Sequence, residues 1–175
     1  MPKYRRMLND WNAPYIQKLI KLMETQSKVT VSNWSIDYAE EVLLPIWNKS
    51  NSSDRRPQLA IDYARKWLND EVKLPEVKKI ILDCHKAAKE NEQNPTAQAT
   101  ARAIGQSAST IHAITHASGL VLYGALAVAY DNLGINASWE QLEQSAAKQC
   151  DRMYEALSKV AIENEPNPAK YNWNC

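Results

Sequence analysis

The chain has 175 residues, of which 45% are hydrophobic and 23% are charged. This is the composition of a globular protein, and the length suits one ordinary domain and is short for two. Lys and Arg number 21 against 20 for Asp and Glu, so the net charge is only +1. That balance argues against binding nucleic acid or an anionic membrane through bulk charge. The four glycines also leave little room for phosphate-binding loops.

The cysteines and the N-terminal segment predict a cytoplasmic protein. Cys84, Cys150 and Cys175 are odd in number, widely spaced and form no CxxC pair, which favours free thiols in a reducing compartment. Cys84 and Cys150 lie on apolar helical stripes, as small core residues do. Residues 1–15 are basic, but no apolar stretch follows them, so we expect no signal peptide.

Prolines mark most of the expected helix starts. Pro14, Pro57, Pro75 and Pro95 each precede a segment with helical apolar spacing, as expected for proline in a first turn. The spacing predicts helices over about 14–27, about 32–49, from about 54, after 75, over about 95–133 and from 138. Pro45 is expected to kink the second helix or to end it early. Residues 28–32 (KVTVS) are the only candidate strand.

The segment from 103 to 130 contains no Asp, Glu, Lys or Arg. A helix without a charged face is usually buried on all sides, at the centre of a bundle. A membrane span is the rival interpretation because residues 111–130 have the required length, but several polar side chains lie within them. We therefore predict an all-α, single-domain bundle of about six helices around a central uncharged helix at about 95–133. The bundle is expected to comprise residues 1–163, and residues 164–175 to form a non-helical tail packed on or near it through Tyr171 and Trp173.

Three histidines, His85, His112 and His116, are the first candidates for chemistry. His112 and His116 are four residues apart, so on a helix both imidazoles project from one face and can present two ligands to a metal ion. If the fourth and fifth helices form a tight antiparallel hairpin, His85 lies level with Arg102. His112 is then roughly 15 Å further along, which is too far for a shared ion.

A metal site would therefore combine His112 and His116 with carboxylates from elsewhere, for which Asp70, Glu71 and Glu155 are candidates. We predict instead no metal and no cofactor, and favour a seam of small and polar residues in which the buried histidines bond to their neighbours. A ligand-binding pocket at this seam is the alternative. The seam residues lie at three- and four-residue steps: Gly105, Ser109, His112, His116, Gly119 and Tyr123.

The turn at Asp54, Arg55 and Arg56 is a second candidate site. Asp54 is expected to cap the third helix, with both arginines in solvent. The alternative is that the two arginines hold a carboxylate from a partner or from another helix. No GxSxG, Walker loop, HExxH or ExxH pattern is present, so we predict no catalytic residue. The candidate binding residues are His112, His116, Arg55, Arg56 and Tyr123.

Several segments together resemble a known family. They include DRRPQLAIDYARKWL at 54–68, LPEVKKIILDCHKAA at 74–88 and NPTAQATARAIGQSASTIHAITHASGLVLYGALAVAYD at 94–131. These resemble the bacterial immunity-protein family, whose hallmark is an RP…A…AR.W segment followed by a long Ala-rich helix with H…TH. The resemblance covers nearly the whole chain. The matching positions are Arg56, Pro57, Ala60, Ala64, Arg65, Trp67, His85, Arg102, Gly105, His112, His116 and Gly119.

The resemblance implies a small all-helical protein without an enzymatic reaction or cofactor, which neutralises a cognate toxin by covering its surface. It assigns none of the matching residues a proven role. Because a net charge of +1 offers no acidic field, a basic nuclease is not favoured as the partner. Two alternatives stay open. One is a helical-bundle enzyme or a small-ligand or metal binder at the His112/His116 seam, and the other is an oligomeric structural protein.

Overall fold

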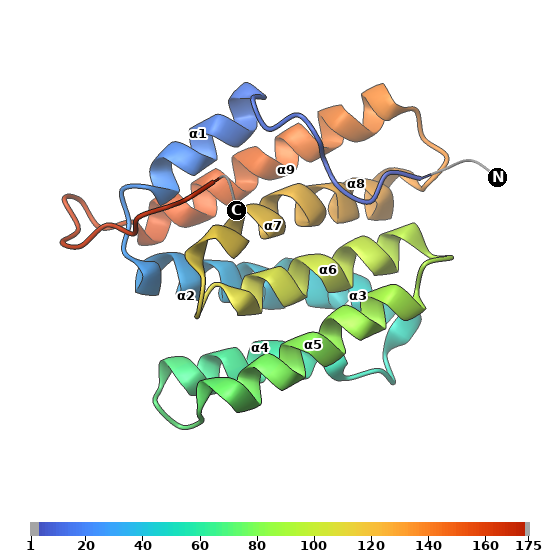
Figure 1. Ribbon diagram of the computed structural model, residues 1–175. Coiled ribbons are helices and arrows are strands. Elements are labelled where there is room, and N and C mark those ends of the chain that lie inside the picture. The colour runs from blue at the N-terminus through green and yellow to red at the C-terminus, as the bar shows by residue number, and fades with distance from the viewer. Residues whose placement is uncertain (1–3, 174–175) are drawn as a thin grey trace.

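The computed structural model describes residues 4–173, and Cys175 lies outside them. Figure 1 shows the arrangement of the helices. Within the described residues there is no β-strand, so the all-α fold class is confirmed. The elements in chain order are α1 (Pro14–Met23), α2 (Lys28–Tyr38), the π-helical turn η1 (Ala39–Leu43), α3 (Leu44–Asn51), α4 (Arg56–Leu68), α5 (Leu74–Glu90), α6 (Pro95–Ser109), the 3₁₀ helix η2 (Ile114–His116), α7 (Ala117–Gly119), the π-helical turn η3 (Leu120–Gly124), α8 (Ala125–Leu133) and α9 (Trp139–Val160).

Local signals placed most helix starts correctly, although α2 begins at Lys28 and not near residue 32. Pro14, Pro57, Pro75 and Pro95 all lie in the first turn of a helix, as predicted. The Asn94 side chain accepts a hydrogen bond of 3.1 Å from the backbone N–H three residues later, which caps α6. These contacts span three or four residues, and for this reason the sequence alone reveals them.

The candidate strand at 28–32 is wrong, because these residues form the first turns of α2. The Ser27 side chain caps this helix, and the helix continues through η1 and α3 to Asn51. Pro45 therefore neither ends nor sharply interrupts the helical path. Pro45 lies in the first turn of α3, just after a π-helical turn. In a regular α-helix, proline lacks the N–H for the i−4 hydrogen bond and its ring clashes with the i−4 carbonyl. The wider π-helical turn accommodates both effects.

The helix predicted over about 95–133 is not continuous, which corrects the sequence analysis. α6 ends at Ser109, the chain reverses over residues 110–113, and α7, η3 and α8 return alongside α6 (Figure 1). Near the break, hydroxyl groups bond to carbonyls of the preceding turn: Ser109 Oγ donates to Gly105 O at 2.8 Å and Thr110 Oγ1 to Ser107 O at 2.7 Å. Such bonds compete with the helical ladder and favour its termination. An uncharged sequence indicates burial, but one long helix and a buried helical hairpin meet that requirement equally.

α6 occupies the centre of the bundle. It packs against α5 on one side and the η3–α8 segment on the other, and it also contacts α2, α3 and α4 (Figure 1). Twelve of its fifteen residues are buried. The chain itself therefore covers the uncharged segment, which accounts for the missing charges without a membrane or a second subunit. No helix within residues 4–173 has both the length and the hydropathy needed to cross a bilayer.

The segment after α9 contains no helix through residue 173 and lies against the connection between α1 and α2. The Glu165 carboxylate accepts bonds of 2.7 Å from the Ser27 backbone N–H, the Ser27 hydroxyl and the Thr30 hydroxyl. Tyr171 donates to the carbonyl of Met23 at 3.1 Å. A carboxylate at the start of α2 also meets the positive end of the helix dipole, so this contact ties the tail to the bundle.

Candidate functional site

His112 and His116 are close together, though not for the predicted reason. His112 lies in the turn after α6 and His116 ends η2, so the two residues do not share a helical face. Their ring centroids are nonetheless 5.2 Å apart, with the rings meeting edge to face at 61°. Both side chains are half-buried. The chain reversal brings the imidazoles together where the sequence analysis expected a straight helix to do so.

His116 is oriented by α6. Its Nδ1 lies 2.7 Å from Gln106 Oε1, so with the amide oxygen as acceptor this nitrogen carries the proton and donates. Gly119 makes this pair possible, because a Cβ at residue 119 would lie 2.5 Å from Gln106 Cγ. Burial lowers the pKa of His116. The ring is therefore a neutral structural link between α6 and the start of α7 at pH 7.

His85 fills the space beside another glycine. Its ring packs on Gly105 of α6 so closely that a Cβ at residue 105 would lie 2.5 Å from His85 Cε1. This position is one turn from Arg102, near the level that the hairpin argument predicted. Burial, and then the charges of Arg102 and His116, lower the pKa of His85 to about 4. His85 is therefore neutral at physiological pH.

Two imidazole nitrogens in this region are buried without a hydrogen-bond partner among the described residues: Nδ1 of His85 and Nδ1 of His112. Burial, and then the charge of His116 and of two lysines, also lowers the pKa of His112. Between residues 4 and 173, no three His, Cys, Asp or Glu side chains are grouped closely enough to hold a metal ion. The structure accordingly does not bring the proposed metal ligands Asp70, Glu71 and Glu155 into one group with the histidine pair.

Arg56 connects two helices. Its guanidinium donates to both carboxylate oxygens of Asp54 and, at 2.6 Å, to Glu90 at the end of α5. The bonds to Arg56 lower the pKa of Asp54. Asp54 also accepts the backbone N–H of Arg56 at 3.1 Å, although Arg55 occupies the N-cap position. Arg55 is exposed and borders a polar depression of about 250 Å³.

A second arginine contact escaped the sequence analysis. Arg65 of α4 donates to Asp37 of α2 at 2.8 Å and also to Glu40 in the adjoining π-helical turn. Arg65 is 28 positions from Asp37 and 25 from Glu40, so no local pattern links it to either carboxylate. Arg65 belongs to the AR.W part of the family hallmark, and this resemblance was the only signal that singled it out.

The predicted seam does not form one stripe. Gly105 faces His85 of α5, whereas Gly119 faces Gln106 of α6, so the two glycines serve different helix contacts. Tyr123 lies half-buried in η3, beyond the turn and inside a segment with π-helical geometry. The chain between Ser109 and Tyr123 passes through a turn and a π-helical segment, so the 3.6-residue periodicity of a straight helix does not hold. The residues predicted to share one face therefore lie on different faces.

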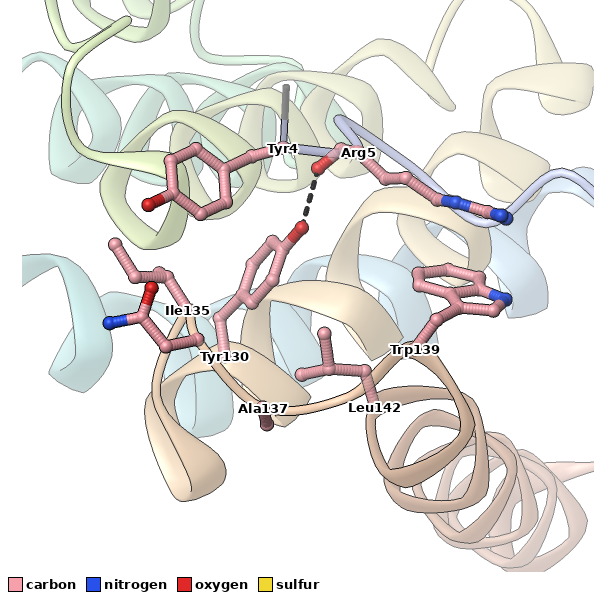
Figure 2. Close-up of a pocket in the computed structure, with 8 residues that line it drawn as sticks. Tyr4, Arg5, Tyr130, Ile135, Ala137, Trp139 and Leu142 are labelled. Atoms are coloured by element: carbon pink, nitrogen blue, oxygen red, sulfur yellow. Dashed lines mark hydrogen bonds between the residues drawn. The ribbon is translucent and has the colours of Figure 1, made fainter. Parts of the chain in front are cut away.

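A pocket of about 400 Å³ at another place was not anticipated. Residues 4 and 5, the end of α8 and the start of α9 surround it (Figure 2). Tyr130 stands between Tyr4 on one side and Trp139 on the other, and its hydroxyl donates to the carbonyl of Arg5 at 2.8 Å. The Arg5 guanidinium lies over the Trp139 ring, 3.7 Å from its centroid. The lining residues are Tyr4, Arg5, Tyr130, Ile135, Asn136, Ala137, Trp139 and Leu142.

Sequence reasoning could find only half of this pocket. The turn between α8 and α9 was anticipated, because Gly134 ends α8 with a φ of 81° and Ser138 begins α9 with a capping box to Gln141. Nothing in the local sequence, however, indicates that residues 4 and 5 pack against a turn more than a hundred positions later.

A sequence model of the family described as Imm-5 like putative immunity protein matches residues 21–156. The match covers well over half of the chain, from within α1 to within α9. The chain belongs to this family. No curated protein and no solved structure matches this chain.

In this chain, several of the hallmark residues make contacts inside the bundle. Arg56 joins α4 to α5, Arg65 joins α4 to α2, and His85 packs on Gly105 between α5 and α6. His116 links α6 to the segment that follows. The residues that carry the family resemblance thus hold helices together, whereas Tyr4 and Arg5 of the pocket lie outside the matched residues.

Proposed function

We propose that this protein neutralises a cognate bacterial toxin by binding to it in the cytoplasm, without catalysing a reaction. Membership of the immunity-protein family, over residues 21–156, is the observation that carries this proposal. The two described cysteines, Cys84 and Cys150, are free and buried, which suits a reducing compartment. Inhibition by contact requires only a stable surface, and a rigid bundle with a closely packed centre provides one.

Among the predicted binding residues, Arg55 is the one best placed for contact with a partner. Its side chain is exposed, whereas Arg56, His112, His116 and Tyr123 are partly buried. Arg56 and His116 are also engaged by Glu90 and Gln106 within the bundle. We therefore assign Arg55 to the toxin-binding surface and the other four residues to support of the fold.

In the test, a candidate secreted toxin, sought first among the genes that neighbour this one, is expressed in a bacterial host alone and together with this chain. Growth is expected to stop with the toxin alone and to recover when both are present. The purified proteins are expected to elute as one complex whose mass, measured by light scattering, equals the sum of both chains. Arg55→Ala should weaken the complex, while Lys18→Ala, on α1 at a distant exposed position, serves as a matched surface control.

Stoichiometry separates binding from catalysis. A non-enzymatic inhibitor abolishes toxin activity only at equimolar amounts, and toxin released from the complex recovers full activity with an unchanged mass. Absence of both rescue and complex would overturn the proposal. Full inhibition at a small fraction of one equivalent, or a changed toxin mass, would instead favour the enzyme alternative.

A further inference from the structure

We propose that the pocket between residues 4–5, the end of α8 and the start of α9 binds a planar aromatic ring that carries a carboxylate. The pocket lies partly outside the residues that the family model matches, and the toxin-binding proposal does not depend on it. Its volume of about 400 Å³ is at the small end of ligand pockets, which run from about 300 to 1,000 Å³. This is room for one ring system with a small substituent.

The lining residues favour an aromatic ring. Tyr130 and Leu142 form the floor of the pocket; they are 3% and 4% exposed, and the Tyr130 hydroxyl is already bonded to the Arg5 carbonyl. Tyr4, Trp139 and Ile135 are only partly buried and stand around this floor with apolar surface available (Figure 2). A flat ring inserted here removes apolar surface from water on several sides and meets other rings in edge-to-face or offset geometry.

Arg5 favours a carboxylate on that ring. The Trp139 ring lies 3.7 Å from the guanidinium carbon and so holds the charged group beside the pocket. One terminal nitrogen, NH1, donates to the Asn9 side chain at 3.1 Å, and the described part of the chain supplies no carboxylate to pair with Arg5. No Asp or Glu lines the pocket. An oriented cation with unused donors beside an apolar floor matches a carboxylate and a ring on one ligand.

Two sources could supply this chemistry. One is a free aromatic acid, such as an aromatic amino acid, and the other is the C-terminus of a polypeptide that ends in an aromatic residue. Both present a ring and a carboxylate a few bonds apart, and they differ in what is attached to the α-nitrogen. The pocket is open on one side, so the structure accommodates either source.

The test titrates the full chain with N-acetyl-L-tryptophan and with its C-terminal amide, which keeps the ring and removes the charge. Binding is followed by the backbone and indole N–H signals in two-dimensional NMR spectra. The acid is expected to shift the signals of Trp139 and Tyr130 and to bind about tenfold more tightly than the amide. L-Tryptophan and an acetylated tripeptide ending in tryptophan then identify the source, since the natural ligand class binds more tightly. Either order supports the pocket.

Variants locate the binding. Arg5→Gln should lower the affinity for the acid about tenfold and leave the affinity for the amide unchanged. Trp139→Ala should lower the affinity for both ligands about fivefold. Arg6→Gln removes the same charge one position later, where the residue does not line the pocket, and should change neither affinity. Equal affinity for acid and amide, equal losses in Arg5→Gln and Arg6→Gln, or shifts confined to residues elsewhere would overturn the proposal. Unchanged melting temperatures confirm that each variant is folded.

Discussion

Replacing Gly105 with alanine tests the close contact between α5 and α6. The new methyl group would lie 2.5 Å from His85 Cε1 and 2.9 Å from both ring nitrogens. These separations are well below van der Waals contact, so the imidazole or the helix must move. The half-buried His85 ring packs on α6 at this point, so moving it to relieve the clash gives up that packing.

The magnitude follows from two opposing effects. Overpacking a closely packed interface costs about 1–3 kcal/mol. Alanine in place of a helical glycine restores about 0.5–1 kcal/mol, because the unfolded chain loses freedom. We therefore expect Gly105→Ala to lower the free energy of unfolding by about 1–2 kcal/mol. For a chain of this size, that is roughly 2–8 °C in melting temperature.

Urea unfolding followed by circular dichroism measures this difference, and a second background makes the test specific. In His85→Ala the clashing ring is gone, so Gly105→Ala should now stabilise the protein by about 0.5–1 kcal/mol. Gly124→Ala is the matched control, because its nearest neighbours are flexible side chains at 3.3 and 3.4 Å and little destabilisation is expected. An equal loss of stability in both backgrounds would refute the reasoning.

Three further predictions concern stability. Burial lowers the pKa of His85 from about 6.5 to about 4, so the stability that the neutral ring contributes is complete above pH 6.5. It is lost as pH falls towards 4, by at most about 1.4 kcal/mol per pH unit. In urea unfolding, the free energy of unfolding should therefore fall less steeply with decreasing pH in His85→Ala than in the unchanged protein. Glu165→Gln should cost about 1–2 kcal/mol and accelerate tryptic cleavage of the tail, whereas the exposed Glu163→Gln should do neither. Arg56→Lys should lower the free energy of unfolding, measured by thermal unfolding, by about 1 kcal/mol, because lysine cannot bond Asp54 and Glu90 at once in the same geometry. Arg55→Lys should cause no measurable change, and equal losses in the two variants would contradict the role of Arg56 in linking α4 to α5.

The sequence predicted the fold class and most helix starts because those depend on neighbouring residues. A proline in a first turn, Asn94 before α6 and the capping box at Ser138 each act within four positions. It predicted the helix ends less well. The break after Ser109 and the π-helical turn before Pro45 lie within segments whose apolar spacing continues through them, so that spacing does not record either feature.

The candidate site shows the same division. His112 and His116 were singled out by their spacing, yet the bend at 110–113 brings their rings together, and Gln106 orients one of them. The ion pairs of Arg56 with Glu90 and of Arg65 with Asp37 cross 28 or more residues, so only the general capacity of arginine to hold a carboxylate was foreseeable.

By itself, the sequence determined a near-neutral, glycine-poor, all-helical chain, most of its helix starts and its resemblance to a family. Those properties follow from composition, from interactions within one helical turn and from the order of motifs. The tertiary structure decided that the uncharged segment folds back on itself, that the hallmark residues connect helices, and that Arg5 meets Trp139 in a pocket. Each of these contacts joins residues whose proximity depends on the path of the whole chain, and no local interaction energy specifies that path.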